Sequence, residues 1–246
     1  MSRFRKLMFV VFTSGTLAGL SLFAVQHFTV IPLIETAETY EAEQHAHSGT
    51  SNEDEGWQPS DGWERTLFTA ITTILSGIGF AAILFGSLSL AGARVNARRG
   101  ALWGLAAFAC FGLAPALGLR PQPPGTAVAG VLERQLWWIG TALATATGLW
   151  LLAGKKQSWP IRIAGVVCLL LPHLIGAPAA SGHNAVPAQL IHRFTITSLA
   201  TIGMFWILLG TMGGFLYSRH ETDQDERLKP TDPRPKQQRG TEHMSC

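Results

Sequence analysis

Carboxylates and histidines gather in one polar segment of the chain. In order, they are Glu35, Glu38, Glu41, Glu43, His45 and His47. Imidazole and carboxylate together suit divalent first-row transition metals such as Co²⁺, Ni²⁺ or Zn²⁺. If the segment is helical, Glu38 and Glu41 share a face, with Glu35 one turn earlier. The segment lacks the paired cysteines of a structural zinc site, so a solvated acidic loop is the alternative interpretation.

A second candidate is His173, which lies in the sequence Leu-Pro-His-Leu-Ile-Gly-Ala-Pro. At 1.5 Å per residue it lies about 18 Å from the basic end of its apolar run. An ionisable residue at membrane depth is a functional candidate by default, here for handling a metal ion or a proton. The alternative is a histidine that hydrogen-bonds between helices as part of the packing.

The elements that position these residues are long apolar runs. The chain has 246 residues, 47% hydrophobic and 14% charged, and its mean hydropathy is +0.22. Soluble domains have about a quarter of their residues charged, so this composition excludes an ordinary soluble enzyme. Three cysteines are too few for a disulfide scaffold. Six runs are long enough, or nearly so, to cross a core of about 30 Å: 7–31, 67–91, 101–119, 135–153, 161–177 and 194–217. The sequence predicts an all-α, polytopic bundle in membrane lipid.

The basic residues predict the orientation of this bundle. Lys and Arg concentrate at the N-terminus, in the second and fourth connections and after residue 217. Both termini are therefore expected to be cytoplasmic. The prediction is a transmembrane bundle over 1–217, an external acidic loop over 35–65, and a disordered cytoplasmic tail over 218–246. Because the net charge of +3 comes from residues that set topology, no nucleic-acid partner is expected.

The orientation places several histidines on one side. His27, His173, His183 and His192 all fall toward the outer end, beside the acidic loop. His27 and His192, taken singly, are more typical of interfacial residues. Together the four suggest an external vestibule that narrows toward His173.

Other patterns concern packing and exclusions. Gly-x-x-x-Gly spacings occur at Gly15, at Gly100 and at Gly210, and allow close helix approach. There is no nucleotide-binding loop, no H-E-x-x-H and no G-x-S-x-G motif. The sequence therefore predicts no enzyme and no bound cofactor.

Several motifs in combination resemble a known family. They are Val30-Ile31-Pro32-Leu33-Ile34, Ala37-Glu38-Thr39-Tyr40-Glu41, Asp61-Gly62-Trp63-Glu64-Arg65-Thr66, Leu113-Ala114-Pro115-Ala116-Leu117-Gly118-Leu119, Arg134-Gln135-Leu136-Trp137-Trp138 and Leu171-Pro172-His173-Leu174-Ile175-Gly176-Ala177-Pro178. In this order they resemble the cobalt transporter subunit CbtA family of bacterial membrane proteins, over most of residues 7–217.

The resemblance implies an inner-membrane component of cobalt uptake with five or six spans. It also implies a small, single-span, histidine-containing partner, CbtB. Carried over by residue, it makes Glu38, Glu41, Glu64 and His173 the best candidates for contacting the ion. Family members often have a histidine-rich stretch after the Ala-Glu-x-Tyr-Glu run, of which His45 and His47 remain here.

The hypothesis is that the acidic loop raises the local concentration of Co²⁺ by electrostatic attraction. Side chains of this loop, those of Glu38, Glu41, His45 and His47, would then replace some of the water molecules bound to the ion. The ion would then reach His27, Glu64, His173 and His192 at the mouth of the bundle. Two alternatives stay open. One is an accessory subunit that scaffolds a partner without transporting; the other is a redox protein that binds haem between two deep histidines.

Overall fold

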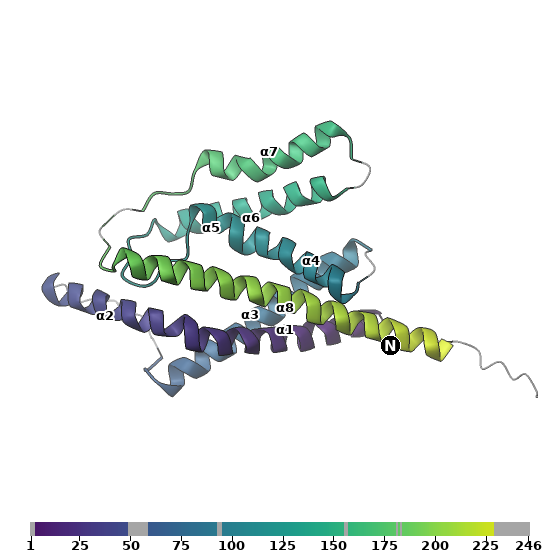
Figure 1. Ribbon diagram of the computed structural model, residues 1–246, viewed down its shortest axis with the longest axis horizontal. Helices are drawn as coiled ribbons and strands as arrows, with labels where there is room; N and C mark the ends of the chain where they lie inside the picture. Colours follow the sequence, from purple (N-terminus) through teal and green to yellow (C-terminus); the bar gives the residue numbers. More distant parts are fainter. Residues whose placement is uncertain are drawn as a thin grey trace, which may run out of the picture.

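The computed structural model describes residues 3–48, 59–92, 95–154, 157–180, 182 and 184–228, and within them every regular element is a helix (Figure 1). The elements are α1 (Arg3–Thr29), α2 (Ile31–Ser48), α3 (Trp63–Leu90), α4 (Ala97–Phe108), the π-helix η1 (Ala109–Leu113), α5 (Ala114–Gly118), α6 (Val131–Ala153), α7 (Trp159–Ile175) and α8 (Ala188–Leu228). The predicted all-α architecture is confirmed.

The helices also confirm the predicted spans. Five are long and apolar enough to cross a membrane: α1, α3, the continuous run α4–η1–α5, α6 and α8. The sixth, α7, has 17 residues and a length of about 25 Å, slightly less than the hydrocarbon core. Many large apolar side chains point outward, among them Leu75, Leu143 and Leu170. The fold is that of a polytopic helical bundle whose outer surface faces lipid.

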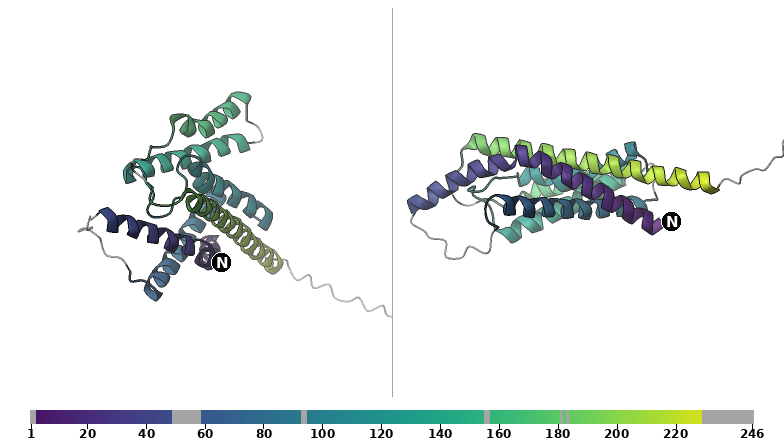
Figure 2. Two further views of the ribbon diagram at one scale, coloured as in Figure 1. Left: turned by 60° about the vertical axis from the view of Figure 1, so that its left-hand side comes forward. Right: turned by 90° about the horizontal axis from the view of Figure 1, so that it is seen from below.

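The bundle has two parts. Helices α1, α3, α4 and α8 form what we call the four-helix body, whose core contains Val10, Phe85, Trp206 and Leu209. Helices α6 and α7 pack mainly on each other and form what we call the α6–α7 hairpin. The hairpin reaches the body through α6, which contacts η1 and α5. Figure 2 shows the hairpin at one side of the body.

Glycines bring the helices of the body close together. A Cβ added at Gly100 of α4 would overlap the carbonyl oxygen of Gly210 on α8, and the reverse substitution would do the same. On the other side of the body, a Cβ at Gly15 of α1 would lie 2.6 Å from the Cα of Ile78 on α3. The Gly-x-x-x-Gly spacings are therefore packing faces inside this chain.

Part of the segment that was predicted to be an external loop is helical. Helix α2 follows α1 after a break at Val30 and continues to Ser48. Pro32 has no N–H to donate to the preceding turn, which explains the break. The structure corrects the predicted loop over 35–65, because residues up to Ser48 are helical. Asn96 caps α4 by accepting a hydrogen bond from the Arg99 N–H at 2.9 Å.

The start of α1 and the end of α8 lie at the same end of the bundle, opposite α2 (Figures 1 and 2). The assignment of that end to the cytoplasm stays a prediction. Helix α8 continues past the predicted boundary at Tyr217 to Leu228. The disordered tail therefore stays a prediction for residues 229–246, which lie outside the described residues.

Candidate functional site

An ion pair joins the two helices that carry the candidate carboxylates. Glu38 on α2 accepts hydrogen bonds from both terminal nitrogens of Arg65 on α3, with 3.1 Å between Nη1 and Oε2. Asp61 lies 3.3 Å from the same Nη1. The Arg65 and Glu38 side chains are 39% and 36% exposed, so water screens the pair and it contributes at most about 1 kcal/mol. A metal ion at Glu38 would have to compete with Arg65.

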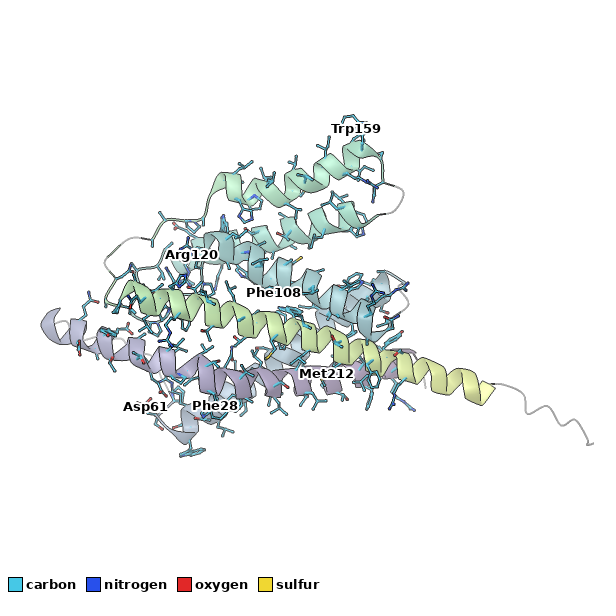
Figure 3. The ribbon with its side chains drawn as sticks, viewed as in Figure 1. Phe28, Asp61, Phe108, Arg120, Trp159 and Met212 are labelled. Atoms are coloured by element: carbon cyan, nitrogen blue, oxygen red, sulfur yellow. The ribbon has the colours of Figure 1, made fainter. Side chains whose placement is uncertain are left out.

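Glu64 stabilises the turn that precedes α3. Its Oε2 accepts hydrogen bonds from the backbone N–H of Ser60, at 3.1 Å, and from the Ser60 hydroxyl. A carboxylate in the first turn is also favoured by the helix dipole. The turn before it depends on Gly62, whose φ of 98° is in the left-handed region. Asp61 lies at this turn (Figure 3).

The candidate histidines lie on three different helices. His27 on α1 packs between the rings of Phe23 and Phe28, at centroid distances of 5.8 and 5.2 Å. Its buried Nδ1 has no hydrogen-bond partner within the described part of the chain. His173, near the end of α7, meets the edge of Trp137 at 6.2 Å. His192 is exposed near the start of α8.

The candidate ligands share one end of the bundle without converging. Among the residues with described side chains, no three His, Cys, Asp or Glu side chains are placed to hold one metal ion. His45 and His47 lie on α2, but their side chains are outside the described set, as is all of His183. The predicted ligands Glu38, Glu41, Glu64, His27, His45, His47, His173 and His192 therefore stay predictions. The described ring contacts do not test the haem alternative, because two axial histidines would lie on opposite faces of the haem.

A cavity of about 1450 Å³ lies at the same end, between the four-helix body and the hairpin. Its walls come from the α1–α2 break, η1 and α5, the loop 119–130, the first turns of α6 and the start of α8. Two guanidinium groups line it, those of Arg120 and Arg134. Figure 3 places Arg120 where α5 ends, beside α8. This cavity was not predicted from the sequence. Its signals there were Arg120, directly before the proline-rich run 121–124, and Arg134, ten residues after that run.

The π-helix forms the floor of this cavity. The Ala114 N–H bonds to the Ala109 carbonyl, five residues earlier. Pro115 follows and has no N–H, so a regular helix would leave a carbonyl without a partner there. The wider turn places Phe111 in a stack on Trp206 of α8, with centroids 5.6 Å apart and an interplanar angle of 13°. Trp138 of α6 lies 6.0 Å from Phe111.

The long apolar helices and their lipid-facing surfaces define a multi-pass membrane protein. A family model described as "Probable cobalt transporter subunit (CbtA)" matches residues 4–218, and the chain belongs to this family. The resemblance seen in the sequence motifs is thus confirmed. Comparisons with curated proteins and with solved structures find no match.

Proposed function

We propose that this chain takes Co²⁺ from the outer side of a bacterial inner membrane and passes it into the helical bundle. The observation that carries the proposal is helix α2. In a chain of a cobalt transporter family, α2 projects beyond the bundle at the end opposite the termini. It bears four carboxylates, those of Glu35, Glu38, Glu41 and Glu43.

Capture begins with the electrostatic field of α2. Its carboxylates raise the local concentration of cations and orient their approach. Glu38 then exchanges Arg65 for the ion, while Glu41 and the imidazoles of His45 and His47 replace further waters. Such partial ligand sets suit a transporter, because an ion that is held weakly can also leave.

The next ligands are those at the mouth of the bundle. His27 offers a buried nitrogen without a hydrogen-bond partner, and Glu64 lies at the start of the neighbouring helix α3. His192 and His173 belong to α8 and α7. Ni²⁺ and Zn²⁺ use the same ligand types, so selectivity for cobalt would depend on a partner or on supply. A small single-span partner would pack on a lipid-facing side of the bundle.

The test is uptake of ⁵⁷Co²⁺ into liposomes that contain this chain alone, with Ni²⁺ and Zn²⁺ as competitors. The variant Glu38→Gln/Glu41→Gln should lose most of the saturable uptake. Glu133→Gln is the matched control, because Glu133 is an exposed carboxylate at the start of α6 and should transport normally. If folded wild-type protein moves no cobalt until a partner is added, the accessory-subunit alternative is correct.

A further inference from the structure

The cavity between the body and the hairpin has the wrong charge for a free metal cation. Among its described lining residues the ionisable groups are Arg120 and Arg134, with no Asp, Glu or His. Neither arginine has an ion-pair partner in the described part of the chain. Two guanidinium groups without a carboxylate partner repel a divalent cation and attract an anion.

The carboxylates closest to this cavity lie outside its lining. Glu133 precedes Arg134 on α6 and is exposed. Glu41 packs beside the loop, since a Cβ added at Gly125 would lie 3.2 Å from the Glu41 Cβ. Gly125 lines the cavity, whereas Glu41 does not. The acidic helix and the basic cavity are therefore neighbours with opposite charge.

Polar and apolar lining groups lie at different depths. Arg120 follows the end of α5 and Arg134 lies in the first turn of α6, so both belong to the end of the bundle that carries α2. Along α8, the lining residues Leu199 and Ile202 lie roughly 16 to 21 Å from its first residue, Ala188. The rings of Phe111 and Trp138 form the floor. The cavity is thus basic at its outer end and apolar deeper in the bundle.

One deep polar group in this wall lacks a partner. Ser198 is 7% exposed, lines the cavity, and its hydroxyl oxygen has no hydrogen bond. A buried hydroxyl without a partner costs roughly 1 to 3 kcal/mol, and a serine in a helix can bond to its own backbone. That oxygen is covered by protein atoms in this structure, so Ser198 contributes to the wall of the cavity without presenting its hydroxyl to a bound molecule.

We propose that this cavity binds one anionic phospholipid. The lipid phosphate lies between Arg120 and Arg134, where guanidinium groups can form paired hydrogen bonds to its oxygens. An acyl chain follows the apolar wall to the aromatic floor. A small oxyanion would satisfy the arginines but leave most of the cavity, whose total volume is about 1450 Å³, unfilled.

The experiment is native mass spectrometry of the full chain, titrated in detergent with phosphatidylglycerol or phosphatidylcholine. Wild-type protein should retain one phosphatidylglycerol in preference to phosphatidylcholine. Arg120→Gln/Arg134→Gln should lower that affinity by roughly 30-fold, since each basic residue near a membrane surface contributes about a fivefold preference. Arg193→Gln, an exposed arginine of α8 outside the lining, is the matched control and should bind normally.

Three results would overturn the proposal: equal retention of the two lipids by the wild-type chain, an unchanged affinity in the folded double variant, or displacement of the lipid by millimolar inorganic phosphate. The last would identify a site for a small oxyanion. If the double variant does not fold, Arg120→Lys/Arg134→Lys replaces it. That variant keeps both positive charges but lacks the forked geometry of the guanidinium groups. Its affinity for phosphatidylglycerol should lie between those of the wild type and the double glutamine variant. A wild-type affinity would contradict the proposal.

Discussion

The four-helix body and the α6–α7 hairpin are built on different kinds of contact. The body joins glycine faces around a core of large side chains, including Phe85, Trp206 and Leu209. The buried residues of the hairpin are small, such as Ala142 and Gly148 on α6. The body is therefore stabilised by the packing of large side chains in its core. The hairpin is stabilised by the close approach of two helices whose buried residues are small.

Both regions contain buried polar groups that are satisfied and others that are not. In the body, the buried Ser14 hydroxyl donates to the Val10 carbonyl at 2.6 Å, and in the hairpin the Thr141 hydroxyl donates to the Trp137 carbonyl at 2.8 Å. Four buried polar atoms have no partner among the described residues: His27 Nδ1, Trp137 Nε1 and the hydroxyl oxygens of Thr145 and Ser198. Unsatisfied groups are costly, so a fold tolerates them mainly where something else is bound or moved. All four lie on α1, α6 or α8, which also contribute lining residues to the cavity, and this points to the cavity side as the working part of the molecule and to the glycine-packed faces of the body as its frame.

The largest effect should come from the frame. Gly100→Ala places a Cβ against the backbone of Gly210, and two helices must separate to accommodate it. Overpacking against backbone should cost about 3 kcal/mol, measurable as a loss of stability to denaturing detergent. Gly86→Ala is the matched control, because a Cβ there meets nothing within 4 Å. Equal stability of the two variants would show that α4 and α8 do not pack as described.

A smaller effect on folding, but a clear one on transport, is expected in the hairpin. His173→Ala removes one edge contact with Trp137, which contributes roughly 1 kcal/mol. The amount of folded protein should therefore be the same as for the wild type. If His173 receives the ion, ⁵⁷Co²⁺ uptake should fall about tenfold or more. Trp137→Phe keeps an aromatic ring beside the imidazole and serves as the packing control. Normal uptake in His173→Ala would remove that residue from the path.

The smallest effect should come from the ion pair at the outer edge of the body. Arg65→Gln breaks a half-exposed pair and should change stability by less than about 1 kcal/mol. It also frees the Glu38 carboxylate from its positively charged partner. Two unit charges about 4 Å apart in water attract each other by about 1 kcal/mol, so removing this competition should raise the affinity for Co²⁺ about fivefold. Equilibrium dialysis with ⁵⁷Co²⁺ measures this. An unchanged affinity would exclude Glu38 as a ligand.

The sequence predicted the membrane helices well because hydropathy and length constrain them strongly. It predicted the Gly-x-x-x-Gly faces but not their pairing, which depends on which helices meet in three dimensions. Helix α2 was expected only conditionally, since its acidic residues fit a solvated loop as well as a helix. The π-helix was missed because Pro115 alone does not say whether a membrane helix kinks, breaks or widens.

The candidate site was less predictable than the fold. Glu38 and Arg65 are 27 residues apart, and nothing in either local sequence shows that they pair. Arg120 and Arg134 lie on either side of a loop, and they line one cavity only because α5 and α6 pack together. The histidines were predicted to line one vestibule because they lie at a similar level along the bundle axis. A similar level does not mean that they are in contact, because they belong to different helices.

The near-continuity of α1 and α2 has a mechanical consequence. Backbone hydrogen bonds meet at the break, from Val30 N–H to the Gln26 carbonyl at 2.9 Å and from Ile34 N–H to the Val30 carbonyl at 3.1 Å. The two helices are therefore joined end to end through a single residue (Figure 1), and a change in the direction of α1 is passed to α2. Helix α2 has 18 residues and a length of about 27 Å. A change of roughly 10° in the tilt of α1, of the kind that bilayer thickness imposes, would move the end of α2 by about 5 Å. Glu38 lies nearer the break and would move less, so the thickness of the surrounding membrane sets how far the outermost carboxylates stand from the bundle.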